Sequence, residues 1–327
     1  MDTFPLLPYL GVLVAGGLAT AAAVPFWQRA CPRLGLVDDP GHRKIHATPT
    51  PLAGGLAVFT GLLVGVLGGS LAVALGAFES RAAELLQYGL SRRAIPLAAI
   101  LLGAAGMLLL GLLDDRRELG AGAKFTGQFL IALLVAAAGV RITLFVPSLV
   151  FSYAVTVLWI LTVTNAMNFN DNMNGLCGGL GCVAAACFAV AAGRHGQYLV
   201  ALLALLVAGC LLGYLPYNYP RARVFLGDSG SHLVGYLLAI LAILPHFYSP
   251  RLSTPRPWAV LSPLLILAVP LLDLATVVVV RTAAGRPFWI GDTNHFSHRL
   301  VRAGLSRPRA VLVLWICAAA GGALSLL

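Results

Sequence analysis

Charged residues are scarce in this chain of 327 residues, because Asp, Glu, Lys and Arg together make up only 10% of it. Soluble domains carry roughly 25% charged residues, and disordered chains combine low hydrophobicity with high charge. Both classes are therefore excluded. Apolar residues instead make up 59% of the chain, and the mean hydropathy is +0.88. These values predict an integral membrane protein of many helices.

The signatures of several common sites are also missing. The six cysteines form no Cys-x-x-Cys pair, which argues against a metal cluster or a redox motif. The chain has no Walker A motif, no GxGxxG motif and no HExxH motif. Their absence argues against the usual nucleotide-binding loops and against a zinc hydrolase. Lysine is nearly absent, since 20 of the 22 basic residues are Arg. The two exceptions, Lys44 and Lys124, suggest positions where a compact ammonium is needed.

Long apolar runs fill most of the chain. A membrane-spanning helix needs about 20 mostly apolar residues, and ten segments qualify: 4–27, 52–77, 94–113, 125–146, 148–168, 176–193, 197–216, 231–247, 258–280 and 308–326. Pro263 and Pro270 lie inside the ninth segment, which we expect to be bent because proline removes a backbone donor. The fold class predicted is an all-α integral membrane protein with about ten transmembrane helices, forming a single domain over residues 1–327.

The charges are distributed unevenly over the nine connections between these segments. The odd-numbered connections hold fifteen of the 22 Lys and Arg residues. The positive-inside rule then places the odd connections in the cytoplasm and both termini outside. Seven of the nine Asp residues lie on the same odd connections, and the even ones have none. This asymmetry predicts a functional site on the cytoplasmic loops.

Two polar clusters follow the third and fifth segments. Asp114 and Asp115 are adjacent at a helix C-terminus, where their repulsion must be offset by neighbouring Arg and Lys or by Mg²⁺, which prefers one or two carboxylates with phosphate oxygens. Five Asn residues occur between 165 and 174. Within this run Asn168, Asp171 and Asn174 recur every third residue, and amides suit the edge of a base such as uracil. Helix termination and a turn are the structural alternative.

Two further clusters precede the eighth segment and the tenth. Residues 224–231 combine small residues with Asp228 at a predicted helix start, which suits either a phosphate site or a simple N-cap. Residues 291–300 carry His295 and His298 at spacing i, i+3, which suits phosphate binding or proton transfer. A basic loop resting on anionic lipid is the alternative. Asp273 lies within the ninth segment, as a functional group or as the packing partner of a residue such as Arg.

In their order along the chain, these clusters resemble the polyprenyl-phosphate N-acetylhexosamine-1-phosphate transferases. That family includes GlcNAc-1-phosphate transferases and the phospho-MurNAc-pentapeptide translocase. The resemblance covers about residues 34–305 and rests on six motifs: LVDDPGHRKIH…PLAGG, GLLDDRRELGAGAKF, NAMNFNDNMNGL, FLGDSGS, PLLDL and GDTNHFSHRL.

The resemblance implies a reaction at a bacterial inner membrane, with the site facing the cytoplasm. A polyprenyl phosphate such as undecaprenyl phosphate attacks a UDP-sugar and releases UMP, in the first membrane step of cell-envelope polysaccharide synthesis. Mg²⁺ is the expected cofactor, with Mn²⁺ as an alternative. The partners expected are these substrates and the lipid bilayer but no nucleic acid, and a homodimer is left open.

The resemblance also assigns roles to residues of this chain. Catalytic roles fall to Asp114, Asp115 and His298, and metal binding to Asp115 and Asp228. The division of work between Asp114 and Asp115 stays open. The residues expected to bind substrate are Lys44, Lys124, Asn168, Asp171, Asn174, His295 and Arg299.

Four positions depart from the family pattern. Asn172 stands where Gly is usual, Asn174 where a second Asp is usual, Ser297 where a His is usual, and Glu118 where the GlcNAc branch has Asp. The missing His favours the GlcNAc branch over phospho-MurNAc-pentapeptide transfer. A transporter or flippase for an anionic lipid or solute is the alternative from another class. It would bind near the bilayer midplane, whereas the charges here gather at one rim. An inactive scaffold is the third alternative.

Overall fold

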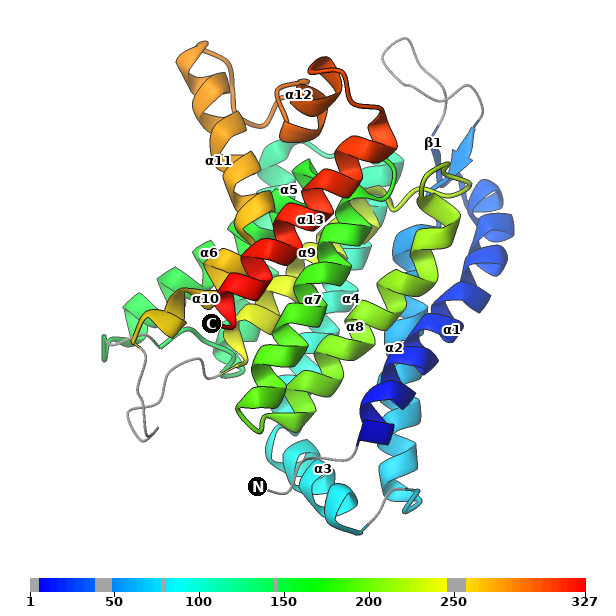
Figure 1. The fold of residues 1–327 in the computed structure, drawn as a ribbon, viewed down its shortest axis with the longest axis vertical. Helices are drawn as coiled ribbons and strands as arrows, with labels where there is room; N and C mark the ends of the chain where they lie inside the picture. The colour runs from blue at the N-terminus through cyan, green and yellow to red at the C-terminus, as the bar shows by residue number, and fades with distance from the viewer. Residues whose placement is uncertain (1–5, 39–48, 78–79, 144–145, 246–256) are drawn as a thin grey trace.

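The computed structural model describes residues 6–38, 49–77, 80–143, 146–245 and 257–327. These residues form a bundle of helices with one small β-pair (Figure 1). Seven helices are long and apolar enough to cross a membrane. They are α1 (Leu6–Ala30), α2 (Gly54–Ala74), α4 (Ala94–Arg117), α6 (Leu149–Phe169), α7 (Leu176–Arg194), α8 (Tyr198–Asn218) and α13 (Arg307–Ser325). The predicted all-α membrane fold is confirmed.

The other three predicted segments are either shorter helices or a broken helix. Helices α5 (Ala121–Ala137) and α9 (Gly227–Ile243) are apolar but shorter. The ninth segment is broken, because Ala259–Ile266 and Ala268–Ala283 meet at an angle of 69°. This break confirms the bend expected from the two prolines. It separates η2 (Pro257–Leu261) and α10 (Ser262–Ile266) from α11 (Ala268–Ala283).

Helix α9 forms the core of the bundle. All residues from Ser229 to Ala242 are buried, and α9 packs against α4, α6, α2 and α7. Glycines make these contacts close. A Cβ on Gly111 of α4 would lie 2.3 Å from Ser229 Cα, and one on Gly235 would lie 2.6 Å from Thr164 Cα of α6. Small residues at helix crossings allow such backbone approach, and this packing brings the ends of α4 and α6 to the start of α9.

The outer faces of the helices are apolar and open. Leu67 of α2, Leu102 of α4 and Leu158 of α6 are 65%, 65% and 67% exposed. Such exposure of large apolar side chains is costly in water but matches lipid acyl chains. The bundle therefore has the surface of a multi-pass membrane protein.

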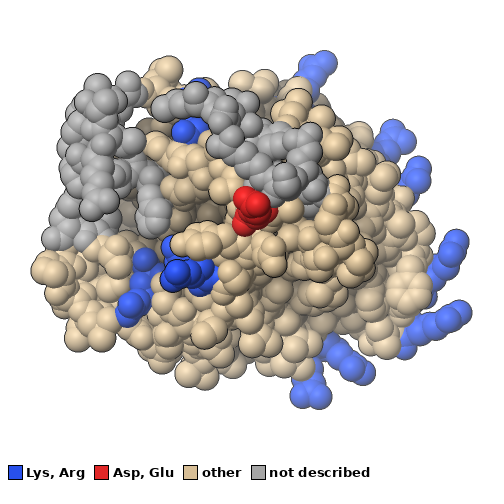
Figure 2. All heavy atoms as spheres, turned by 90° about the horizontal axis from the view of Figure 1, so that it is seen from below, with Lys and Arg blue, Asp and Glu red and all other residues tan. Residues whose placement is uncertain are grey.

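The two ends of the bundle differ. Strand β1 (Val37–Asp38) pairs antiparallel with β2 (Thr50–Pro51) after the short helix η1 (Cys31–Leu34), and α12 (Phe296–Arg302) lies at the same end. The opposite end carries α3 (Ser80–Arg92), an amphipathic helix that we did not predict. Figure 2 views the molecule from that side and shows one small acidic patch. At the β1 end, Asp38, Asp114, Asp115, Asp171 and Asp228 line one cavity. Which side of a membrane this end faces stays a prediction.

Candidate functional site

A cavity of about 1020 Å³ opens at the end of the bundle that carries β1 and β2. Its wall is built by the ends of α4 and α6, by the starts of α5, α9 and α13, and by the connections 170–175 and 219–226. The volume lies at the upper end of the range for small-molecule sites. Most of the residues selected from the sequence line it together: Asp114, Asp115, Lys124, Asn168, Asp171, Asn174 and Asp228.

The charged centre of the cavity consists of Asp114, Lys124 and Asp228. Lys124 Nζ forms an ion pair with Asp114 Oδ2 and lies 3.4 Å from Asp228 Oδ2. The Asp114 side chain is 1% exposed, whereas those of Lys124 and Asp228 are 29% and 34% exposed. Asp114 also accepts a hydrogen bond from the Leu119 N–H at 2.8 Å. The buried Asp114 thus fixes the position of the Lys124 ammonium, and the more exposed Lys124 and Asp228 side chains face the cavity.

Asp228 is held on its other side by the end of α6. Asn168 Nδ2 donates to Asp228 Oδ1 at 2.7 Å and to Ser231 Oγ at 2.9 Å. Asn168, which lines the cavity, therefore orients the carboxylate of Asp228, and its amide oxygen accepts no hydrogen bond from a described residue.

Asp115, which we predicted as a metal ligand, contacts the start of α9. Its Oδ1 accepts the Asp228 N–H at 2.7 Å and its Oδ2 accepts the Ser229 N–H at 3.1 Å. Gly227 makes this possible, because its φ of +73° is in the left-handed region and a Cβ there would lie 2.8 Å from Asp115 Oδ2. Both oxygens thus satisfy free N–H groups at the start of α9. These contacts indicate an anchor for α9, and the role of Asp115 as a metal ligand stays a prediction.

Asp171 lies in the turn that follows α6. Its side chain lines the cavity and has no hydrogen-bond or ion-pair partner among the described residues. Enclosure by the protein, with added repulsion from Asp228 and Asp115, raises the pKa of Asp171 to about 8. A bound cation near Asp171 and Asp228 would relieve this repulsion and favour the charged form.

The five Asn residues between 165 and 174 divide into two groups. Asn165 lies inside the bundle and donates to Gln128 Oε1 at 2.6 Å, and Asn170 donates to the Ala166 carbonyl at 2.9 Å. These two stabilise helices. Asn168, Asn172 and Asn174 line the cavity. The three-residue recurrence of Asn168, Asp171 and Asn174 does bring them to one cavity, although α6 ends at Phe169 and a turn, not a helix, carries the last two.

Three residues that we predicted to be in the site, His295, His298 and Arg299, belong to α12 or directly precede it. They are not among the described residues that line the cavity. His295 is 5% exposed. Its Nδ1 lies 2.6 Å from Asp273 Oδ2, and its Nε2 lies 3.4 Å from Arg281. Both ring nitrogens thus have protein partners, and the substrate-binding role of His295 stays a prediction. Asp273 therefore contacts a histidine, whereas the packing alternative had expected a residue such as Arg. The functional alternative for Asp273 stays a prediction.

His298 and Arg299 lie further along α12. Partial burial, with His295 and Arg302 nearby, holds the pKa of His298 below its ordinary value. Arg299 is exposed, and its Nε donates to the Asn294 carbonyl at 2.8 Å. Their predicted roles stay predictions. Lys44 lies outside the described residues.

Two of the departures from the family pattern contact each other. Ser297 Oγ donates to Asn172 Oδ1 at 2.6 Å, and the Asn172 amide donates back to the Phe169 carbonyl at 2.7 Å. Asn172 lines the cavity, so this contact docks α12 against the cavity wall. The two replacements are therefore a matched pair, which the separate motifs could not reveal.

The sequence reasoning missed several polar residues of the cavity wall, among them Arg307 and Asn218. Arg307 enters the wall from the first residue of α13, and its basic character at a segment boundary was the available signal. Asn218 accepts from the Gly175 N–H and donates to the Val224 carbonyl at 2.9 Å. It joins the connections 170–175 and 219–226, and no local pattern marks such a long-range contact.

The oxygen atoms of the cavity fit Mg²⁺. The carboxylates of Asp171 and Asp228 and the amide oxygen of Asn168 belong to residues that line the same cavity. Within the described residues, no group of three His, Cys, Asp or Glu side chains is placed to hold a metal ion. Mg²⁺ prefers one or two protein carboxylates, with waters and phosphate oxygens in the other positions.

Comparison with known proteins gives consistent matches. Residues 97–246 match the model of glycosyl transferase family 4. A probable undecaprenyl-phosphate N-acetylglucosaminyl 1-phosphate transferase of Bacillus subtilis is 33% identical, over 91% of this chain and 79% of the relative. A decaprenyl-phosphate N-acetylglucosaminephosphotransferase of Mycobacterium tuberculosis is 37% identical, over 90% and 76%. An undecaprenyl-phosphate alpha-N-acetylglucosaminyl 1-phosphate transferase of Escherichia coli is 26% identical, over 94% and 80%.

Proposed function

The chain belongs to glycosyl transferase family 4, and from this premise we propose that it transfers N-acetylglucosamine 1-phosphate from UDP-N-acetylglucosamine to a polyprenyl phosphate. The other product is UMP, and the reaction is the first lipid-linked step of envelope polysaccharide synthesis. The observation that carries the proposal is the convergence of Asp114, Lys124 and Asp228 in one cavity at the end of a membrane bundle.

The charge arrangement of the cavity suits this reaction. A lipid phosphate must approach a diphosphate, and phosphoryl transfer depends mainly on positioning and on neutralising negative charge. Lys124 supplies an ammonium at the cavity wall, and the buried Asp114 fixes its position. Arg307 adds a second cation from α13. These groups can hold the two phosphates together without large rearrangement.

Metal dependence is part of the proposal. Asp228 and Asp171 would hold Mg²⁺, with the amide oxygen of Asn168 beside them. When bound, Mg²⁺ neutralises charge on the phosphate oxygens. Asn168 keeps Asp228 oriented, and Asp115 keeps the start of α9 in place. The cavity end carries most of the basic residues, so we place it in the cytoplasm.

A panel of donors tests the function. The purified protein would be mixed with undecaprenyl phosphate, Mg²⁺ and one UDP-sugar at a time, and UMP release would be measured. We expect release with UDP-N-acetylglucosamine and at least tenfold less with UDP-glucose or UDP-MurNAc-pentapeptide. Faster turnover of UDP-MurNAc-pentapeptide would overturn the sugar assignment. No UMP release with any donor would overturn the transferase proposal and leave the transporter alternative.

Asn174 tests the nucleotide end of the cavity. Its side chain is exposed to the cavity, and Nδ2 lies 3.3 Å from the Pro220 carbonyl. An amide can accept from uracil N3–H and donate to a neighbouring acceptor. We expect Asn174→Ala to raise the KM for the UDP-sugar by about tenfold, the scale of one hydrogen bond of about 1.4 kcal/mol. Turnover at saturation should change little, because the contact is remote from the reacting phosphate.

The conservative variant Asn174→Asp is the control, since it keeps an acceptor at the same place and should stay active. Steady-state kinetics with UMP as a competitive inhibitor would separate the two effects. An unchanged KM together with unchanged UMP inhibition in Asn174→Ala would remove Asn174 from the nucleotide site.

The contact between Ser297 and Asn172 is tested by a double-mutant cycle. We expect Ser297→Ala and Asn172→Ala each to reduce turnover by about threefold to tenfold, because each frees α12 from the cavity wall. The turnover of the double variant should equal that of the less active single variant, which corresponds to a coupling energy of about 1 kcal/mol between the two side chains. Fully additive losses would show that the 2.6 Å contact has no role in the site.

A further inference from the structure

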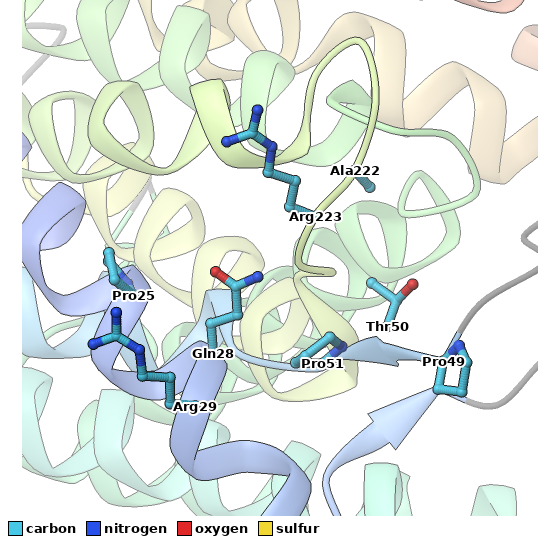
Figure 3. Close-up of a pocket in the computed structure, with 8 residues that line it drawn as sticks. All are labelled: Pro25, Gln28, Arg29, Pro49, Thr50, Pro51, Ala222 and Arg223. Carbon is cyan, nitrogen blue, oxygen red and sulfur yellow. The ribbon is translucent and has the colours of Figure 1, made fainter.

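A second cavity lies beside the candidate functional site. It has a volume of about 740 Å³ and is formed by three parts of the chain. The end of α1 supplies Pro25, Gln28 and Arg29, residues 49–51 supply Pro49, Thr50 and Pro51, and the connection before α9 supplies Ala222 and Arg223 (Figure 3). We call this space the Arg29–Arg223 cavity.

The polar side chains that line this cavity are basic or neutral. Arg29 and Arg223 are both exposed, and neither guanidinium has a hydrogen-bond or ion-pair partner among the described residues. No Asp or Glu occurs among the described residues that line the cavity. Gln28 adds an amide donor between them (Figure 3). A guanidinium presents a planar fork of N–H donors that matches a phosphate group.

The surroundings place this cavity at the level of lipid headgroups. Arg29 ends a helix that is apolar and long enough to cross a membrane. Phe26, one turn earlier, is 62% exposed and packs edge-to-face on Trp27 at 5.1 Å. Aromatic residues gather where acyl chains meet headgroups. The next turn of α1, which carries Gln28 and Arg29, therefore lies where lipid phosphates lie.

The Arg29–Arg223 cavity shares a wall with the larger cavity but is separate from it. Thr50 and Ala222 line both. The wall is held by backbone hydrogen bonds, since the Phe225 N–H donates to the Pro51 carbonyl at 2.9 Å and the Gly54 N–H donates to the Phe225 carbonyl at 2.9 Å. An anion bound at Arg223 therefore contacts the same connection that leads into Gly227 and Asp228.

We propose that the Arg29–Arg223 cavity binds the phosphate group of an anionic membrane lipid. The shared chemistry is a lipid-borne phosphate. It could come from a bulk phospholipid such as phosphatidylglycerol, or from the polyprenyl phosphate of the proposed reaction. The site follows from the two guanidinium groups that line one cavity, neither of which pairs with a described residue, and from their level in the membrane. Binding does not require the UDP-sugar.

Lipid titration in nanodiscs of neutral phosphatidylcholine tests the proposal. One arm adds phosphatidylglycerol and the other adds undecaprenyl phosphate, both without UDP-sugar, and bound lipid is counted by native mass spectrometry. We expect the double variant Arg29→Gln/Arg223→Gln to weaken binding in at least one arm by about tenfold or more, since each basic group near a membrane surface contributes substantially to anionic-lipid binding.

Arg33→Gln is the matched control, because Arg33 is exposed on η1, close in sequence to Arg29, but does not line the cavity. It should change binding less than twofold. A loss confined to the phosphatidylglycerol arm identifies a bulk lipid, and a loss confined to the other arm identifies the substrate lipid. Equal affinities of the double variant, the control and the unmodified protein in both arms would overturn the proposal. UMP release is measured separately, so that result would leave the proposed function intact.

Discussion

Replacing Asp228 with Asn should reduce UMP release by at least about 100-fold, the scale expected when one preorganised electrostatic group is lost. Asp228 has one carboxylate oxygen 2.7 Å from Asn168 and the other 3.4 Å from Lys124. An amide keeps the shape of this side chain but removes its charge, so the cavity loses the group best placed to hold a divalent cation. The start of α9 keeps its backbone contacts with Asp115, and we expect the protein to stay folded.

Metal binding gives this prediction a second measurement. Mn²⁺ binding, followed by electron paramagnetic resonance, should weaken by at least tenfold in Asp228→Asn and to a smaller degree in Asp171→Asn. Glu84→Gln, which changes a carboxylate on α3 at the other end of the bundle, is the control and should match the unmodified protein. Normal Mn²⁺ affinity in Asp228→Asn would show that the metal, if required, binds elsewhere.

Replacing Asp115 with Ala should reduce both turnover and stability. Its two oxygens accept the N–H groups of Asp228 and Ser229, and a buried donor left without a partner costs about 1–3 kcal/mol. The start of α9 would shift, and Asp228 would shift with it. A displacement of about 1 Å at a reacting centre can cost about 100-fold in rate. We therefore expect a lower thermal unfolding temperature together with a loss of turnover of that size.

Comparison of the Asp115 and Asp228 variants distinguishes a residue that anchors α9 from a residue that binds the metal. Thermal unfolding in detergent, followed by circular dichroism, should show a clear decrease for Asp115→Ala and little change for Asp228→Asn. Asp115→Asn should fall between them, because its one remaining carbonyl oxygen can still accept one of the two N–H groups. If Asp115→Ala unfolds at the normal temperature and loses only metal binding, the anchor role assigned here is wrong.

The sequence by itself determined the class of the protein and the identity of most cavity residues. Membrane helices depend on the length and continuity of apolar runs, which are local properties. Each of the ten predicted segments contains a helix accordingly, although only seven of these helices, in the part of the chain that the structure describes, are long enough to span a membrane by themselves, and the segment with Pro263 and Pro270 is broken near the expected place. Polar residues that interrupt such runs are costly unless they have a function. The clusters at Asp114, Asn168, Asp171 and Asp228 therefore stood out before their contacts were known.

The tertiary structure decided which of these residues do what. Asp114 and Asp115 are neighbours in sequence, but only the close packing of Gly111 on Ser229 turns Asp115 toward the start of α9 and leaves Asp114 to Lys124. His295 is likewise enclosed by Asp273, 22 residues earlier. The helix α3 was missed because its apolar residues cover only one face and give no continuous run. The positions of Asp115 and His295 depend on contacts between distant segments, and motif spacing carries no information about such contacts.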